Sequence, residues 1–294
     1  MWSRRIWTLV VLGMCLAPGC LKLDSFIFSP WTTDEYLRPE DMRPEWSVDF
    51  IIPPDKYREV ELVSSDGNRI FGFLVDPPTG TPRDDATVIY FHGNSHHINR
   101  YWGRVELLWE MGYRVFIIDY QGYGKSDGSP SGPACYADGR TALEYVLDQP
   151  AVNPERIVFY GLSMGSFITT YLAADSFTPL GAILVSAPAS VSAITKEGTV
   201  FDLPASYLTE LDFDNESRIG RVDCPVLLMH GKDDDYLLLK RHPFRLVEAA
   251  EKGGTTLVVA WVEGAGHDNV VETMGERYAE VITDFISRAV GQEP

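Results

Sequence analysis

The sequence predicts an α/β fold, in which a mostly parallel sheet of about eight strands is covered by helices on both faces. Short apolar runs, typical of strands buried on both faces, alternate with helical patterns along most of the chain. With 294 residues, of which 45% are hydrophobic and 23% charged, the chain has the balance of a globular protein with one large domain. We expect a signal peptide over residues 1–19, an extension over 20–54 and the folded domain over 55–294.

The first residues have the pattern of an export signal. A basic start at Arg4 and Arg5 precedes an apolar run over residues 6–17, a small residue and Cys20. The run is shorter than the roughly 20 apolar residues of a membrane-spanning helix. Its end resembles the lipobox of bacterial lipoproteins, although Leu is usual where Ala17 stands. That resemblance implies a lipid-modified Cys20 and a location in the cell envelope, periplasmic or at the outer surface. An uncleaved signal anchor and plain secretion are the alternatives.

The extension after Cys20 is rich in proline and aromatic residues. Trp31, Tyr36 and Trp46 make it too apolar for a pure linker, so we expect it to pack partly on the domain.

Strand and helix signals alternate through the domain. Two β-rich runs, Val60 to Val63 and Arg69 to Val75, flank a turn cluster and predict an antiparallel hairpin. Further strands are expected at 86–91, 115–118, 157–160, 182–185, 226–229 and 257–262, and helices at 101–111, 134–147, 163–174, 241–250 and 273–290. Parallel sheets of this kind place their active sites at the carboxyl ends of the strands.

Charge and motif content exclude several classes of function. The formal net charge is −17, which repels phosphate backbones and makes nucleic acid an unsuitable partner. His92, His96 and His97 lack the glutamate of a zinc-binding helix, so no metal is expected. Gly124-Lys125-Ser126 lacks the upstream glycine of a phosphate loop, and no dinucleotide fingerprint occurs, so no cofactor is expected.

The strongest chemical signal is Gly161-Leu162-Ser163-Met164-Gly165, which lies between a predicted strand and a predicted helix. This pattern and context are typical of a nucleophile elbow, in which a sharp turn lifts the serine hydroxyl above the sheet. Side chains at the two glycines would collide with the neighbouring backbone. We therefore predict Ser163 as the nucleophile. The alternative is a glycine-rich turn without a catalytic role.

A serine hydroxyl needs a base to take its proton, and an acid to orient that base. His267 follows the last strand in a glycine-rich loop and is the best-placed of the six histidines. The acid is expected in the run Asp233-Asp234-Asp235, which follows the strand over 226–229, with Asp268 as a competitor. The backbone amides of Met164 and Asn94 are the expected donors to an oxyanion.

Ordered motifs over about residues 58 to 288 resemble the α/β-hydrolase superfamily, and within it the serine aminopeptidase S33-like and BEM46-like branch. They are Phe91-His92-Gly93-Asn94, Asp119-Tyr120-Gln121-Gly122-Tyr123-Gly124-Lys125-Ser126, Gly161-Leu162-Ser163-Met164-Gly165, Pro225-Val226-Leu227-Leu228-Met229-His230-Gly231 and Gly264-Ala265-Gly266-His267. The resemblance implies an α/β-hydrolase fold with a lid, which is short here, over about 187–223. In this branch the acid follows a His-Gly-x-x-Asp pattern, which selects Asp234. Gln121 departs from the usual arginine in a turn that is structural.

The expected activity is hydrolysis of an ester, of the carboxylesterase or lipase type, through an acyl-enzyme on Ser163, His267 and Asp234. The expected substrate is a small or lipid-like acyl compound, and the lipidated N-terminus makes the membrane a second partner. A peptidase, an amidase or a thioesterase would use the same triad. A non-catalytic binding module of the envelope is the alternative from another class.

Two features stay open at this level. Cys135 and Cys224 could pair after export, but two buried apolar cysteines are the simpler interpretation. The apolar residues of the lid segment could line an acyl pocket or form the core of the lid; they are Phe201, Leu203, Tyr207, Leu208 and Phe213.

Overall fold

The computed structural model of the protein describes residues 27–38, 52–80, 85–197 and 211–291. The strands are β1 (Ser29–Pro30), β2 (Tyr57–Val63), β3 (Arg69–Val75), β4 (Thr87–Phe91), β5 (Ser95–His96), β6 (Arg114–Asp119), β7 (Ile157–Leu162), β8 (Gly181–Val185), β9 (Val226–Gly231) and β10 (Leu257–Val262). The α-helices are α3 (Trp102–Glu110), α4 (Gly132–Leu147), α5 (Gly165–Asp175), α6 (Val191–Glu197), α7 (Glu216–Ile219), α8 (Pro243–Gly253), α9 (Val270–Met274) and α10 (Glu276–Ala289).

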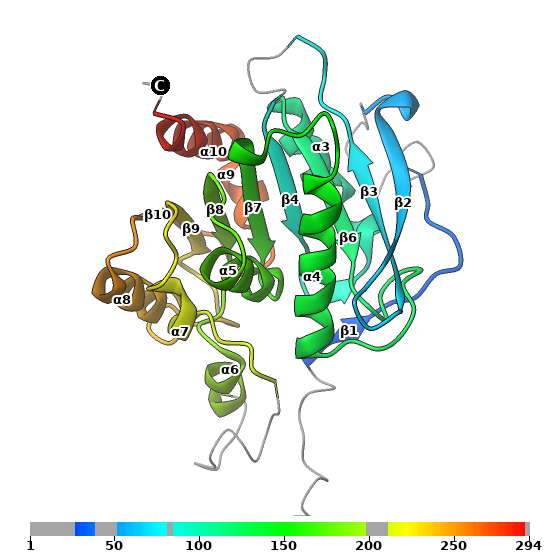
Figure 1. The fold of residues 1–294 in the computed structure, drawn as a ribbon. Helices are drawn as coiled ribbons and strands as arrows, with labels where there is room; N and C mark the ends of the chain where they lie inside the picture. Colours follow the sequence, from blue (N-terminus) through cyan, green and yellow to red (C-terminus); the bar gives the residue numbers. More distant parts are fainter. Residues whose placement is uncertain (1–26, 39–51, 81–84, 198–210, 292–294) are drawn as a thin grey trace, which may run out of the picture.

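One sheet forms the centre of the described chain, and its eight strands run in the order β10-β9-β8-β7-β4-β6-β3-β2 (Figure 1). The six strands from β10 to β6 are mutually parallel, whereas β3 and β2 are antiparallel to their neighbours. The predicted hairpin is therefore the edge of the sheet. The α/β class and the mostly parallel sheet predicted from the sequence are confirmed.

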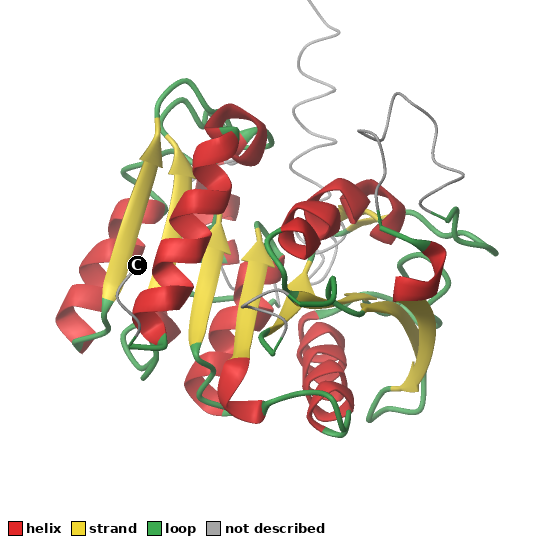
Figure 2. Cartoon of the chain, turned by 90° about the horizontal axis from the view of Figure 1, so that it is seen from above, coloured by secondary structure: helices red, strands yellow, loops and turns green. Residues whose placement is uncertain are grey.

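Helices cover both faces of the sheet, as the view from above shows (Figure 2). Apolar residues of α4, α5 and α8 join the core cluster on one face, and those of α3, α9 and α10 join the cluster on the other. Because both faces are covered, every residue of β4, β6, β7, β8 and β9 is buried. This explains why these strands are continuous apolar runs in the sequence.

The register of the parallel strands aligns their carboxyl ends. Phe91 of β4 pairs with Gly161 of β7, which pairs with Leu184 of β8, and Leu184 pairs with Leu228 of β9. Leu228 in turn pairs with Val259 of β10. The loops that follow these strands therefore start at one edge of the sheet, and every candidate catalytic residue lies in one of them.

Two predicted helices differ in detail from the structure. The helix expected over 273–290 is two helices, α9 and α10, because Gly275 adopts φ 56° and ψ −134°, which breaks the helical path. The helix expected from Ser163 begins at Gly165, because Ser163 has φ 48° and belongs to the turn.

The two domain cysteines, Cys135 and Cys224, are both free and buried. Burial raises the pKa of the Cys224 thiol to about 12 and that of Cys135 well above its ordinary value. Both act as small apolar core residues, as the simpler interpretation of the sequence expects.

The start of α5 packs against the end of β4 without room for a side chain. A Cβ atom at Gly165 would lie 2.0 Å from the Phe91 carbonyl oxygen and 2.7 Å from that of His92. Both obstacles are backbone atoms, so a flexible side chain cannot move aside to relieve the clash. The absence of a side chain at 165 therefore sets how closely the Ser163 turn approaches the loop after β4.

We expect Gly165→Ala to destabilise the protein by at least about 3 kcal/mol, at the upper end of overpacking costs. The matched control is Gly103→Ala in α3, where an added Cβ meets nothing within 4 Å. That substitution should be neutral, or should stabilise the protein by up to about 1 kcal/mol. Urea unfolding followed by circular dichroism measures both effects. Equal stabilities of the two variants would contradict the packing argument.

Candidate active site

Ser163 occupies a strained turn between β7 and α5. Its φ of 48° lies in the left-handed region that non-glycine residues rarely adopt. Three hydrogen bonds hold the turn: Ser163 N donates to the Val185 carbonyl over 2.8 Å, and the Ser163 carbonyl accepts from the amide and the hydroxyl of Ser166. This is the geometry of a nucleophile elbow, in which backbone strain presents the hydroxyl above the sheet.

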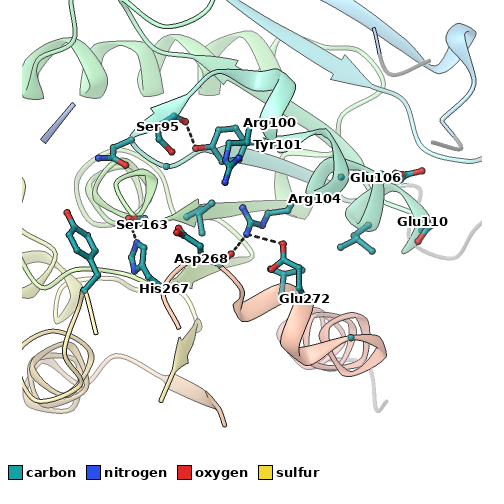
Figure 3. A pocket seen from close by; sticks show the side chains of 18 of the residues that line it. Ser95, Arg100, Tyr101, Arg104, Glu106, Glu110, Ser163, His267, Asp268 and Glu272 are labelled. Atoms are coloured by element: carbon teal, nitrogen blue, oxygen red, sulfur yellow. Dashed lines mark hydrogen bonds and ion pairs between the residues drawn. The ribbon is translucent and has the colours of Figure 1, made fainter. Parts of the chain in front are cut away.

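The structure brings together the three side chains that the sequence analysis selected. Ser163 Oγ lies 3.1 Å from His267 Nε2, and His267 Nδ1 lies 2.9 Å from Asp234 Oδ2. The residues follow three different strands, β7, β9 and β10, and are separated in sequence by 33 to 104 positions. Ser163 and His267 lie next to each other at one end of a pocket (Figure 3).

Asp234 is buried, whereas its neighbours Asp233 and Asp235 are exposed. Its Oδ1 accepts from the amides of Tyr236 and Leu237, at 3.0 and 2.6 Å. Its Oδ2 lies 2.9 Å from His267 Nδ1 and 3.1 Å from His230 Nε2. Burial alone would raise the pKa of this carboxyl, but the hydrogen bonds from His230, His267 and the Leu237 amide outweigh it. The pKa of Asp234 therefore lies well below its usual range, and the group stays ionised.

His230 is a supporting residue that the sequence analysis did not assign. Its side chain is fully buried, and Nε2 faces two acceptors, the carboxylate of Asp234 and the Leu237 carbonyl at 3.1 Å. Nε2 therefore carries a proton and donates it toward the acid. The signal was available, because His230 directly follows the strand predicted over 226–229 and begins the His-Gly-x-x-Asp pattern.

Two further residues hold the loop that carries His267. Ser186 Oγ donates to the His267 carbonyl over 2.9 Å, and Arg104 Nη2 donates to the Asp268 carbonyl over 3.0 Å. Arg104 also lies 3.5 Å from Glu272, so that it links α3 to α9 across the pocket wall (Figure 3). Neither residue was identified from the sequence. Ser186 directly follows a predicted strand and could have been found, whereas Arg104 lies within a helix and carries no local signal.

Asn94 lies in the loop after β4, and Met164 directly follows Ser163. Within the described part of the chain, neither backbone amide donates to an acceptor. Both residues line a small pocket beside Ser163. Two amides that have no acceptor in the described ranges and lie beside a serine hydroxyl are candidate donors to an oxyanion.

A pocket of about 1060 Å³ opens in front of Ser163. Its walls combine apolar side chains, such as Leu107 and Val271, with the charged side chains of Arg104 and Glu272. The volume is at the upper end of the range for small-molecule sites. The pocket therefore accommodates an organic substrate larger than the reacting carbonyl group.

The remaining histidines of the Phe91-His92-Gly93-Asn94 loop do not converge on a metal. His92 is buried with Nε2 3.0 Å from Asp119 Oδ1, and His96 packs against Trp31 with ring centroids 4.4 Å apart. Across residues 27–38, 52–80, 85–197 and 211–291, no three His, Cys, Asp or Glu side chains form a group that could hold a metal ion. His92 and Asp119 instead brace the loop that carries Asn94.

Several predictions concern residues outside the described ranges. These are the signal segment with Cys20, Trp46 of the extension, and the lid residues Phe201, Leu203, Tyr207 and Leu208. Phe213 is described: it is buried and stacks on Phe167 at 4.8 Å, so it belongs to the core. No helix in the described ranges has the length and apolar character needed to cross a membrane.

Comparisons with known proteins show which family this chain resembles. Residues 82–201 match the model of the family described as serine aminopeptidase, S33. The protein YfhR of Escherichia coli (strain K12) is 31% identical over 253 residues, covering 83% of this chain and 86% of YfhR. The human alpha/beta hydrolase domain-containing protein 17B is 30% identical over 229 residues, covering 76% of this chain and 73% of that protein.

Solved structures show the same fold at lower identity. An esterase from Pyrococcus furiosus superposes with a TM-score of 0.69 at 17% identity, covering 89% of this chain and 98% of the esterase. An acylaminoacyl peptidase superposes with a TM-score of 0.63 at 15% identity, covering 81% of this chain and 42% of the peptidase. The chain is 31% identical to YfhR and 30% identical to the human protein, over most of the length of each. It therefore belongs to the α/β-hydrolase superfamily.

Proposed function

We propose that this hydrolase is a serine hydrolase that cleaves carboxylic esters through an acyl-enzyme on Ser163. The observation that carries the proposal is the continuous chain of contacts from Ser163 Oγ to His267 Nε2 and from His267 Nδ1 to Asp234 Oδ2, at 3.1 and 2.9 Å. These distances lie within hydrogen-bond reach, as general-base activation of a serine requires.

The ionised carboxylate of Asp234 determines which nitrogen of His267 carries a proton. Asp234 Oδ2 accepts a hydrogen bond from His267 Nδ1, which places the single proton of the neutral imidazole on Nδ1. Nε2 is then unprotonated and faces Ser163 Oγ. As the hydroxyl attacks the substrate carbonyl, Nε2 takes its proton, and the resulting imidazolium gives it to the leaving alcohol. Water then attacks the acyl-enzyme by the same route in reverse.

The negative charge that develops on the carbonyl oxygen needs two fixed donors. The amides of Met164 and Asn94 serve this purpose in our proposal, because both lie beside Ser163 and neither has another acceptor within the described ranges. Donors of this kind stabilise the tetrahedral intermediate more than the planar substrate. In this proposal the loop after β4 contributes to the rate together with the triad.

A peptidase acting on the same triad is the second candidate, and the description of the matched S33 family model favours it. The two candidates differ in the leaving group, an alcohol in one case and an amine in the other. The ratio of kcat/KM for a p-nitrophenyl ester to that for an aminoacyl p-nitroanilide of equal acyl size, each divided by the rate constant of its uncatalysed hydrolysis, decides between them. Ratios near one would contradict a preference for esters.

We also propose that the chain is exported and anchored by a lipid at Cys20, on the strength of the basic start, the short apolar run and the small residue before the cysteine. Fractionation of cells that express the Cys20→Ser chain tests the anchor. Persistence of that chain in the membrane fraction would contradict it.

The first prediction concerns the nucleophile. A fluorophosphonate probe should label the wild-type protein at Ser163, because His267 Nε2 lies 3.1 Å from its hydroxyl oxygen and can take the proton. Ser163→Ala should remove the labelling and lower esterase kcat by about four orders of magnitude or more. Ser176→Ala, which removes an exposed hydroxyl at the far end of α5, is the matched control. A folded wild-type protein that takes no label would instead support a non-catalytic binding module.

The second prediction concerns the acid. Asp234→Asn should lower kcat by about three to four orders of magnitude, because an amide at this position favours the wrong tautomer of His267. Asp233→Asn, an exposed neighbour, is the matched control and should leave kcat within about twofold of wild type. Steady-state kinetics on a p-nitrophenyl ester measures both. A larger effect at 233 than at 234 would reassign the acid.

The third prediction concerns pH. The folded-state pKa of Asp234 is depressed, so the ionised carboxylate stabilises the folded state above the ordinary aspartate pKa of about 3.9. This stabilisation is lost as the pH falls from about 5 toward the folded-state pKa. The difference in unfolding free energy between wild type and Asp234→Asn should therefore shrink between pH 7 and pH 3. Urea unfolding at both pH values measures it, and an unchanged difference would argue against a buried ionised acid.

A further inference from the structure

The segment before the domain, residues 27–38, lies against the loop that carries Asn94. Its strand β1 pairs in parallel with β5, with Ser29 opposite Ser95 and Pro30 opposite His96. Farther along, the amide of Gly124 donates to the Trp31 carbonyl over 2.8 Å, and Thr33 N donates to the Gly124 carbonyl over 2.9 Å. The segment is therefore bonded to two of the loops at the carboxyl edge of the sheet.

The far end of this segment is fixed by Tyr36. Its ring is buried against Phe73, and its hydroxyl donates to Asp119 Oδ2 over 2.6 Å. Asp119 Oδ1 in turn accepts from the amide of Ile98 and lies 3.0 Å from His92 Nε2. The segment thus shares a buried acid with both ends of the Asn94 loop.

Asn94 itself is bonded to the segment twice. Its side-chain amide donates to the Ile27 carbonyl over 2.9 Å, and its backbone carbonyl accepts from Ser29 N over 3.1 Å. Ile27 also lines the small pocket beside Ser163, together with Asn94 and Met164. The segment consequently reaches the place where the scissile carbonyl binds in the proposed mechanism.

Three tyrosines of the domain also donate hydrogen bonds to backbone carbonyls of this loop. Tyr120 donates to the His92 carbonyl, Tyr123 to that of Asn94 and Tyr101 to that of Ser95, at 2.9, 2.8 and 2.7 Å. Burial raises the pKa of Tyr101 to about 12 and also raises the pKa values of Tyr120 and Tyr123 above the ordinary tyrosine value, so all three hydroxyls remain donors. The Asn94 carbonyl accepts from both Tyr123 Oη and Ser29 N. The orientation of the loop peptides therefore depends on donors from the domain and from residues 27–38.

We propose that residues 27–38 are a positioning segment of the active site, which holds the Asn94 loop in the orientation that an oxyanion needs. The inference rests on the proposed function, because it assigns the Asn94 loop its role in the rate. Ser29 is the positioning residue, and it acts through its backbone amide. In this scheme the segment between the exported N-terminus and the domain is part of the catalytic apparatus rather than a spacer.

The test uses the purified full-length chain. Ser29→Pro removes the amide that donates to the Asn94 carbonyl, while proline is tolerated in an edge strand. Loss of one positioning hydrogen bond should lower kcat by about three- to tenfold and leave KM within about twofold. Ser29→Ala keeps the amide and should recover the wild-type kcat. Asp34→Ala, an exposed side chain on the same segment, controls for substitution in this region.

Active-site titration with the fluorophosphonate separates positioning from a folding defect. A variant that merely folds poorly has fewer titratable sites and an unchanged kcat per site, whereas a mispositioned oxyanion loop lowers kcat per site. Asn94→Ala, which removes the bond to Ile27 but keeps the backbone amide of residue 94, should show the same lowered kcat per site. It serves as the second variant if Ser29→Pro does not fold.

The outcomes also distinguish this inference from the proposed function. An inactive, unlabelled wild type would overturn the function itself. An active wild type with unchanged kcat per site in Ser29→Pro and Asn94→Ala would overturn only the positioning role. A lowered kcat per site in either variant, recovered in Ser29→Ala for the first, supports it.

Discussion

The register of the parallel strands is the constraint on which the site depends. Because Phe91, Gly161, Leu184, Leu228 and Val259 form one row across the sheet, the loops after these five strands all begin at the same edge, although β9 and β10 extend farther beyond the row than the other three. A shift of one residue in any pair would turn the buried side chains of that strand to the opposite face, which the apolar cores on both faces prohibit. Packing of the apolar core therefore fixes the relative positions of the loops that carry Ser163, Asp234 and His267.

Strain at Ser163 is maintained by contacts rather than by the turn itself. A serine at φ 48° costs about 1 to 3 kcal/mol of conformational strain. Gly165 has no side chain, so its backbone packs directly against the end of β4, and this contact fixes the start of α5 beside the Ser163 turn. Ser166 returns two hydrogen bonds to the Ser163 carbonyl, and Asn215 holds the Ser166 hydroxyl over 2.8 Å. Asn215, which directly precedes α7, thus supports the Ser163 turn from a distant part of the sequence.

How much the sequence could predict depends on how local each signal is. The elbow, the strand and helix that flank it, and the glycine-rich histidine loop all have short-range signatures in the sequence. Ser163 and His267 can therefore be selected from the sequence alone. Asp234 was chosen from three adjacent aspartates by family pattern alone, whereas in the structure burial separates it from the exposed residues 233 and 235. Arg104 and the bonds of residues 27–38 to the Asn94 loop join elements far apart in sequence, and such contacts leave no periodic trace.

The hydrogen bonds of Asp234 explain why one carboxylate can serve His267 without taking its proton. Oδ1 is occupied by two backbone amides and Oδ2 is shared by two imidazoles, so that the four lone-pair directions of the ionised group all face donors. Protonation would forfeit at least one of these bonds in a buried place, where an unpaired donor is costly. In the proposed mechanism, His230 therefore acts indirectly, because its hydrogen bond helps to keep Asp234 charged while His267 alternates between its neutral and protonated forms. In the proposed mechanism, the transferred proton passes through His267 in both half-reactions, and Asp234 remains a carboxylate throughout.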